Sequence, residues 1–449
     1  MDRLIHGRYT ELRAWERLAM KGIVTSCKFL VRSVPHASML TLLYLMLVPG
    51  RWTLNRLLVV VLCLCEVGFF LYWKLRISRP FQRKPSALSE EERATLCRNL
   101  VENVEDMEDM LARWLVERPS GPFQKEHYID WIVWMLFDKK AEELTVNEEA
   151  QLKRLVPQLL INIDQSISKP SKKKYLPIRP SIDTMNMQPK PFVLYVLIKC
   201  IQALGFITLY LLGFRRSKAD GLTYWHSRGH SMEPPILYIH GIGIGFAMYM
   251  AKLIVIGAFH KHRRIFLLEL PHISMEITDV IPDHDETLNA IDTIFKTHSL
   301  EKVSVVGHSY GTVLASWLMR ERPCYLSRLT LVDPVCFCMW DSTLARNFLY
   351  SKPISFVHEL ALFFISSDPL IAHTVSKELY WNESVLYPKD ISVPARIFLS
   401  AHDWVVDATI CNDYLQKRLP SHCKVELMET SHGGCLGSKL YLYKIAQCI

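Results

Sequence analysis

The chain has 449 residues and a formal net charge of +8, from 53 Lys and Arg against 45 Asp and Glu. Half of its residues are hydrophobic and 22% are charged, which excludes a disordered or fibrous protein. The longest basic run, Lys172 to Lys174, is too short for a nucleic-acid surface, so we expect no nucleic-acid partner. The 12 cysteines include no pair of C-x-x-C motifs, which argues for reduced thiols and against a zinc site or a disulfide scaffold.

Residues 1–85 carry the signals of a membrane-associated region. Residues 1–32 are basic and lack the apolar core and cleavage site of a secretory signal. The apolar run 37–48 is too short to cross a hydrocarbon core of ~30 Å, whereas the run 57–73 reaches about 26 Å as a helix and spans it marginally. Glu66 in the second run costs about 2–3 kcal/mol on insertion scales, which its apolar neighbours can offset. Basic residues on both flanks favour a hairpin with both ends in the cytosol.

Residues 86–180 are predicted to form a helical subdomain. Two capping boxes, Ser89 with Glu92 and Thr145 with Glu148, mark the starts of helices, because hydroxyl and carboxylate cap the first turn reciprocally. Apolar residues recur at helical spacing between the two boxes, as expected for helices that share a core.

After a proline-rich linker at 170–191, the apolar segment 190–216 has three interpretations. It can span the membrane with Lys199 reaching to the interface, or lie in the headgroup plane as an amphipathic helix. It can also pack as a buried helix on the domain that follows. The sequence leaves these three alternatives open.

From residue 220 to 449 the pattern changes to short apolar runs separated by helical stretches. The runs are 236–239, 265–268, 303–306, 329–332, 395–399 and 425–428. Nearly continuous apolar strands that alternate with helices indicate a parallel sheet covered on both faces. The predicted fold class is therefore α/β, with a mostly parallel central sheet and helices on both faces, preceded by an α-helical, membrane-associated N-terminal region.

The third run leads into Gly307-His308-Ser309-Tyr310-Gly311, followed by a helical pattern. This is a G-x-S-x-G motif between a strand and a helix, where the serine occupies a tight, strained turn that exposes its hydroxyl. The carboxyl edge of the sheet and the start of a helix favour negative charge that develops there. Ser309 is therefore a candidate nucleophile.

The first run ends in the glycine-rich segment 240–245, which includes Gly241 and Gly243. Glycines after a strand let backbone N–H groups turn toward a substrate oxygen, and together with the N–H of Tyr310 they would form an oxyanion hole. A phosphate-cradling turn is less favoured, because the spacing is not G-x-G-x-x-G.

A nucleophilic serine needs a base and a carboxylate that orients the base. The fifth run leads into Asp403 and the sixth into His432, so the chain order is serine, aspartate, histidine, each after a strand. Asp333, which follows the fourth run, is an alternative acid. His402 and Asp407 form an H-x-x-x-x-D pattern that supplies a base in some acyltransferases.

With these motifs, the stretch from Pro234 to Gly434 resembles the α/β-hydrolase superfamily, in particular its membrane-anchored serine hydrolases. The roles that this resemblance implies are nucleophile for Ser309, orienting acid for Asp403, base for His432, and oxyanion donors for the backbone N–H groups of Ile242 and Tyr310. The segment 335–392 falls where the family inserts a lid. Its aromatic residues could line an acyl pocket or form a core: Trp340, Phe348, Phe356, Phe363, Phe364, Tyr380 and Trp381.

We therefore predict a membrane-associated serine hydrolase that cleaves the carboxylic ester of a lipid or another apolar acyl compound through an acyl-enzyme on Ser309. The alternatives are an acyltransferase with the same acyl-enzyme and a non-catalytic binding protein on this fold. No metal or organic cofactor is implied. The expected location is an intracellular membrane such as the endoplasmic reticulum, with the catalytic domain facing the cytosol. A glycosylation sequon at Asn382 has meaning only in a lumenal domain.

Overall fold

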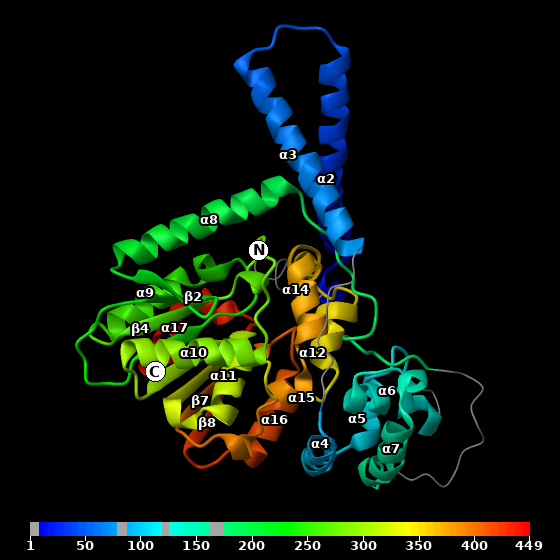
Figure 1. Ribbon diagram of the computed structural model, residues 1–449, viewed down its shortest axis with the longest axis vertical. Helices are drawn as coiled ribbons and strands as arrows, with labels where there is room; N and C mark the ends of the chain where they lie inside the picture. Colours follow the sequence, from blue (N-terminus) through cyan, green and yellow to red (C-terminus); the bar gives the residue numbers. More distant parts are fainter. Residues whose placement is uncertain (1–8, 79–87, 119–124, 162–174) are drawn as a thin grey trace.

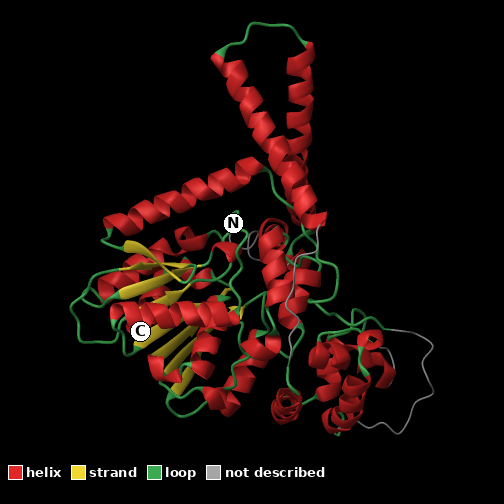
Figure 2. Cartoon of the chain, viewed as in Figure 1, coloured by secondary structure: helices red, strands yellow, loops and turns green. Residues whose placement is uncertain are grey.

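The computed structural model describes residues 9–78, 88–118, 125–161 and 175–449. An eight-stranded sheet lies at the centre of the C-terminal half, with helices on both faces (Figures 1 and 2). Its strand order is β1-β2-β4-β3-β5-β6-β7-β8; β2 is antiparallel to β1 and β4, and the other neighbours are parallel. The strands are β1 Arg215–Ala219, β2 Leu222–His226, β3 Ile236–Ile239, β4 Ile265–Glu269, β5 Val303–His308, β6 Leu326–Val332, β7 Ala395–His402 and β8 Cys423–Ser431.

The central strands bury both of their faces, because alternate side chains enter two different cores. In β3, Ile236 and Tyr238 belong to the core that α9 and α17 cover, whereas Leu237 and Ile239 belong to the core under α10, α11 and α16. The helices are α9 Met250–Phe259, α10 His284–His298, α11 Gly311–Glu321, α16 Ala408–Arg418 and α17 Lys439–Gln447. The predicted α/β fold with a mostly parallel sheet is thus confirmed.

The antiparallel pair β1 and β2 has no counterpart among the predicted strands. β1 reads Arg-Arg-Ser-Lys-Ala and is mostly exposed, so it has no apolar run to detect. Asp220 and Gly221 join the two strands, and both have positive φ values, of 44° and 86°. An Asp-Gly pair of this kind is a standard signal of a two-residue hairpin turn, and it would have located both strands.

A helical subdomain precedes the sheet in the chain and lies beside it (Figure 1). Its helices are α4 Glu90–Asn103, α5 Met107–Arg113, α6 Lys125–Phe137 and α7 Val146–Leu159. The Ser89 hydroxyl accepts from the N–H of Glu92, and Thr145 does the same for Glu148, so both predicted capping boxes are present. The predicted linker at 170–191 lies partly outside the described residues, as does the basic run at 172–174.

Two long helices form a hairpin that projects from the rest of the protein: α2 Ala14–Leu47 and α3 Leu54–Ser78 (Figure 1). Our prediction that the run 37–48 is too short to span is wrong as a statement about the helix, because α2 is one helix of 34 residues. Its N-terminal half is polar enough to contact the protein, where Lys28 pairs with Glu359 at 2.8 Å. Both helices contain a window long and apolar enough to cross a membrane.

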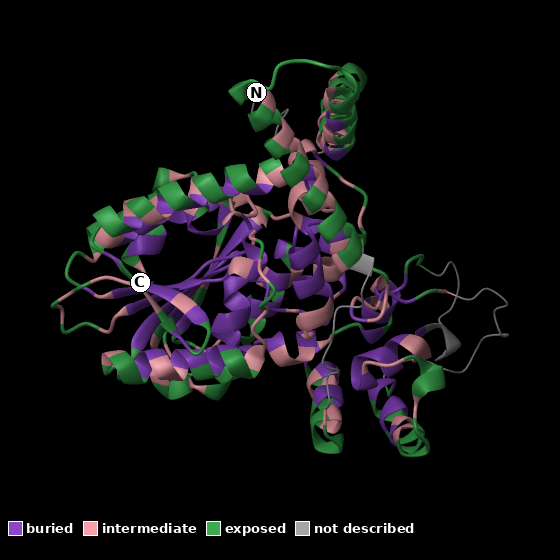
Figure 3. Ribbon diagram, turned by 45° about the horizontal axis from the view of Figure 1, so that its top comes forward, coloured by how far each residue is buried: buried purple, intermediate pink, exposed green. Residues whose placement is uncertain are grey.

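The helix α8, Phe192–Leu211, lies along the body of the protein and runs across the direction of the hairpin (Figures 1 and 3). Glu66 of α3 is buried against the first turn of α8. Its carboxylate accepts hydrogen bonds from the N–H groups of Phe192 (2.9 Å) and Val193 (3.2 Å). Glu66 therefore caps the N-terminus of α8 and stabilises its free N–H groups. The sequence predicts only that Glu66 adds an energetic cost to a membrane span, and the structure shows that its carboxylate has specific hydrogen-bond partners.

Between β6 and β7, residues 335–392 form short helices that cover the carboxyl edge of the sheet. They are α12 Thr343–Ala345, α13 Phe356–Ala361, α14 Pro369–His373 and α15 Trp381–Ser384, with π-helical turns at Arg346–Tyr350, Leu362–Ser366 and Thr374–Glu378. We refer to residues 335–392 as the lid.

Candidate active site

Ser309 lies in the turn between β5 and α11. Its φ is +51°, in the left-handed region that non-glycine residues rarely adopt, and its N–H donates to the carbonyl of Val332 at 3.0 Å. The motif glycines make this turn possible because a Cβ on Gly311 would lie 2.2 Å from the carbonyl oxygen of Ile239, and one on Gly307 would lie 2.9 Å from the carbonyl oxygen of Gly311. The strained turn is thus held by close backbone contacts on both sides.

Three side chains from three loops form one hydrogen-bonded chain. The Ser309 Oγ lies 2.8 Å from Nε2 of His432, and Nδ1 of the same ring lies 2.6 Å from Oδ2 of Asp403. The other carboxylate oxygen of Asp403 accepts from the N–H groups of Val405 (2.7 Å) and Val406 (3.2 Å). These distances suit proton transfer from the serine to the imidazole, with the carboxylate fixing the ring.

The surroundings of His432 favour its charged form. Burial lowers the pKa of the imidazole, but the charge and hydrogen bond of Asp403 and the charge of Asp333 outweigh burial and raise it to about 9. A base of this strength accepts the serine proton readily once it is neutral.

The glycine-rich segment after β3 packs directly on the turn that carries Ser309. A Cβ on Gly241 would lie 2.7 Å from the Cβ of Ser309, so only glycine fits. Among the described residues, neither the N–H of Ile242 nor that of Tyr310 has a hydrogen-bond acceptor, and both residues line the pocket at Ser309. The two N–H groups are available to a substrate oxygen. For Gly243, the close neighbour of an added Cβ is the flexible side chain of Met248.

Asp333, the alternative acid, lies behind the triad. It accepts from the Ser400 hydroxyl at 2.6 Å and from the N–H of Gly433 at 2.7 Å, and its Oδ2 lies 3.7 Å from Nε2 of His308. Nδ1 of His432 pairs with Asp403, whereas Asp333 acts on His432 through its charge. Burial raises the pKa of Asp333, but the two histidines and Ser400 outweigh burial and hold the pKa well below its usual value.

His308, Asp333 and Cys435 bring a nitrogen, a carboxylate oxygen and a sulfur within 4.8 Å of one another. Such donors could hold a metal ion, but Lys252 is buried in the same region and interacts electrostatically with Asp333 and Cys435. The carboxylate oxygens of Asp333 also already accept two hydrogen bonds. The donors therefore fit a buried polar network better than a cation site, and we assign no metal to them.

The H-x-x-x-x-D pattern is not brought to the triad. His402 is exposed and its Nε2 lies 3.4 Å from Glu429, while Asp407 caps α16 by accepting from the N–H groups of Thr409 and Ile410. Asp407 thus has the local role of a helix N-cap, and His402 pairs with a residue outside the triad.

The pocket at Ser309 is apolar apart from the triad. Its walls come from the lid and from the loop after β7: Val335, Leu344, Phe348, Ala361, Ile365, Val375, Leu379, Trp404 and Val405. Of the seven lid aromatics proposed for an acyl pocket, Phe348 lines it, whereas Tyr380 and Trp381 line a second cavity and Trp340 stacks on Tyr387. Trp404 also lines the pocket and is not among the predicted wall residues, because it directly follows Asp403 and lies outside the lid.

The sequence comparisons give a limited match. No family model matches the chain. A stretch of 118 residues is 29% identical to the abhydrolase domain-containing protein abhd-5.2 of Caenorhabditis elegans, covering 25% of this chain and 26% of that protein. The match thus spans about a quarter of the length of this curated relative.

Solved structures with a similar fold include naproxen esterase (carboxylesterase NP) from Bacillus subtilis, at 12% identity. The match covers 56% of this chain and 95% of that one, with a TM-score of 0.39. A meta-cleavage product hydrolase from Pseudomonas fluorescens IP01 is 15% identical, with 52% of this chain and 96% of that one covered and a TM-score of 0.40. At these identities the similarity concerns the fold alone.

Proposed function

We propose that this chain, which belongs to the α/β-hydrolase superfamily, is a membrane-associated serine hydrolase that cleaves carboxylic esters of apolar acyl groups. The observation that carries this proposal is the hydrogen-bonded chain from Ser309 through His432 to Asp403, which opens on an apolar pocket. The three groups come from separate loops, and a purely structural role would not require them to meet.

The reaction begins with proton transfer from Ser309 to His432 as the hydroxyl attacks the ester carbonyl. Asp403 stabilises the imidazolium, and the N–H groups of Ile242 and Tyr310 bind the oxyanion. His432 then returns the proton to the departing alcohol, which leaves an acyl group on Ser309. Water, activated by the same histidine, releases the acid and restores the enzyme.

The pocket supports an apolar acyl group over a polar one. Phe348, Val375 and Leu379 of the lid line it together with Ser309, and so does Trp404. A polar acyl chain would lose its hydration there without gaining hydrogen bonds, at a cost of roughly 1–3 kcal/mol per group. An apolar chain gains about 0.8 kcal/mol for each methylene buried.

Membrane association is supported by apolar surface on the projecting hairpin. Its exposed side chains include Met39, Leu40, Leu43, Leu47, Leu57, Leu58, Val61 and Leu62. A contiguous apolar surface of this kind is rare on a protein that stays in water. We assign it to contact with lipid, so that the hairpin holds the active site next to substrates dissolved in the bilayer.

The position of α8 favours the interfacial interpretation over a third span. Ile198, Gln202 and Leu209 face the protein and are buried, and the Gln202 amide donates to the carbonyl of Ser274 at 2.8 Å. The opposite face exposes Val193, Leu197, Leu204, Ile207 and Leu211. Because α8 extends away from the hairpin at an angle to its direction (Figure 1), a bilayer that surrounds the hairpin would meet the exposed face of α8 side-on.

The test is hydrolysis of p-nitrophenyl butyrate by the full chain purified in detergent. We expect Ser309→Ala to lower kcat by about 10³-fold or more. The matched control Ser421→Ala, at an exposed serine in the turn before β8, should retain wild-type kcat. Equal hydrolysis by wild type and Ser309→Ala would overturn the proposal.

A further inference from the structure

We infer that the acyl chain of a long-chain ester runs from Ser309 through the lid into a second apolar chamber, formed where the lid meets the helical subdomain. This inference rests on the proposed function, because it concerns the substrate of the same site. It gives the helical subdomain a role in substrate selection.

Two cavities meet in the lid. The first is the active-site pocket and the second, the distal chamber, lies on the other side of the lid residues that separate them; both are partly open to solvent. Leu344, Val375 and Leu379 line both cavities, so these three side chains stand between them. We call these three residues the partition. An acyl chain that displaces the side-chain ends of the two leucines, Leu344 and Leu379, passes from one cavity into the other.

The distal chamber is built from two parts of the chain that are far apart in sequence. Trp114 and Trp134 come from the helical subdomain, while Met339, Leu349 and Trp381 come from the lid. Both cavities are lined mainly by apolar side chains.

The two indole N–H groups and the Ser181 hydroxyl in the walls of the distal chamber donate hydrogen bonds within the protein. Nε1 of Trp134 donates to the Ser181 hydroxyl at 2.5 Å, and Ser181 donates to Oδ1 of Asp138 at 2.5 Å. Nε1 of Trp114 donates to the carbonyl of Trp340 at 2.6 Å. The indole rings thus offer carbon faces to an occupant, which suits a hydrocarbon chain.

The chamber keeps its shape because lid and subdomain are joined by specific hydrogen bonds. Arg346 of the lid donates to the carbonyls of Arg113 and Leu115 at 2.6 Å, where α5 ends. Lys377 donates to the carbonyls of Ser181 and Asp183 at 2.9 and 2.8 Å. Charged donors from the lid therefore bind carbonyls of the subdomain and of the segment that directly follows it.

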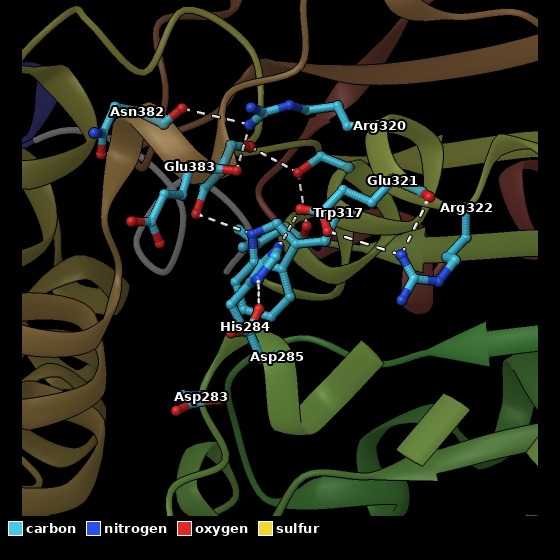
Figure 4. A network of polar contacts seen from close by, with 12 residues as sticks. Asp283, His284, Asp285, Trp317, Arg320, Glu321, Arg322, Asn382 and Glu383 are labelled. Carbon is cyan, nitrogen blue, oxygen red and sulfur yellow. Dashed lines mark hydrogen bonds and ion pairs between the residues drawn. The ribbon is translucent and has the colours of Figure 1, made fainter. Parts of the chain in front are cut away.

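The wall at Trp381 is fixed to the catalytic domain. Arg320 of α11 points toward Asn382 and Glu383 in α15 (Figure 4) and donates to the carbonyl of Glu383. The indole N–H of Trp317 donates to the hydroxyl of the buried Ser384 at 3.3 Å. Glu383 and Ser384, which belong to the sequon at Asn382, take part in these contacts, and Ser384 is buried.

Each methylene buried in such a chamber adds about fourfold in binding. We therefore expect the enzyme to prefer acyl chains that reach past the partition over chains that end in the active-site pocket. The class of substrate is an ester of a long, unbranched fatty acid.

The experiment compares p-nitrophenyl palmitate with p-nitrophenyl butyrate on the full chain in detergent. Ala345→Phe fills the distal chamber, since Ala345 lines that cavity and not the pocket at Ser309. We expect the palmitate-to-butyrate ratio of kcat/KM to fall by about tenfold or more. Leu349→Phe, also in the distal chamber, should lower the same ratio and guards against a folding defect in the first variant.

The matched control is Ala141→Phe, an exposed alanine in the same subdomain, which should leave the ratio at the wild-type value. An unchanged ratio in both chamber variants, with wild-type melting temperatures, would overturn the inference while the hydrolase proposal stands. If the wild type cleaves neither ester, the proposed function itself fails.

Discussion

Asp333 contacts residues that lie close in sequence to each member of the triad. Its carboxylate accepts from Ser400, three residues before the triad acid, and from Gly433, directly after the triad histidine. His308, directly before Ser309, lies 3.7 Å away and contacts Tyr249, whose hydroxyl in turn accepts from the N–H of Gly241. We regard Asp333 as a positioning residue that also raises the proton affinity of His432.

The pH dependence of activity tests this electrostatic role. Because the pKa of His432 is raised to about 9, the imidazole is protonated and inactive as a base below that pH, and kcat/KM should rise through the alkaline range. Asp333→Asn removes one of the charges that raise the pKa, so the rising limb should move to lower pH. Asp403→Asn should instead lower kcat by about 10⁴-fold. An unshifted limb in Asp333→Asn would mean that Asp333 is only structural.

Gly241 offers a steric test of the oxyanion loop. Gly241→Ala would place a Cβ 2.7 Å from the Cβ of Ser309 and 2.9 Å from the carbonyl oxygen of His308, so the loop must shift. We expect a loss of kcat of about 10²-fold or more, the cost of one misplaced oxyanion donor. Gly257→Ala in α9 is the control, because nothing lies within 4 Å of its added Cβ. Wild-type kcat in Gly241→Ala would contradict the assigned loop.

At the scale of single elements, the capping of α8 by Glu66 can be measured. Glu66→Gln weakens an acceptor of two helix N–H groups, so we expect the protein in micelles to lose about 1 kcal/mol of stability. Glu301→Gln, at an exposed position before β5, should have no measurable effect. If Glu66 faced lipid instead, its neutralisation would stabilise the protein, so a raised melting temperature would contradict the docking of α3 on α8.

The elements that could be located from the sequence are those in which successive residues are all buried or alternate regularly between buried and exposed. The six parallel strands are buried on both faces and therefore appear as apolar runs. The edge strand at Arg215–Ala219 has no such run, and α2 extends well beyond its apolar part because Lys28 and Arg32 contact the lid. When half of a helix contacts other parts of the protein through polar side chains, hydropathy alone underestimates the length of the helix.

The meeting of Ser309, His432 and Asp403 could be predicted from the sequence, whereas the walls of the pocket could not. Strand ends and chain order were enough to select Ser309, Asp403 and His432, because parallel strands bring their carboxyl ends to one edge. The walls of the distal chamber include Trp114 and Trp134 together with lid residues that lie more than 200 positions later in the sequence. Local sequence patterns do not indicate such long-range contacts.

At the scale of the whole molecule, both ends of the hairpin return to the body that carries the active site (Figure 1). Basic residues lie at this base, including Lys28 and Arg32 in α2 and Lys74 and Arg76 in α3. Positive charge at the base of a membrane segment favours the cytosolic side. We therefore expect the body to face the cytosol.

The exposed Cys324, in the turn between α11 and β6, reports on this orientation. A membrane-impermeant maleimide should modify it when only the plasma membrane is permeabilised, as read by peptide mass spectrometry, and Cys324→Ser should abolish that signal. Labelling that appears only after full detergent lysis would place the body in the lumen and contradict this orientation.

The measurement that bears most directly on the central claim is covalent labelling by a fluorophosphonate probe. The probe requires a serine that is made nucleophilic by its neighbours. We expect a single modified peptide containing Ser309 in the wild type, none in Ser309→Ala, and strongly slowed labelling in His432→Ala. Equal labelling of wild type and Ser309→Ala, or a modified serine elsewhere, would contradict the account.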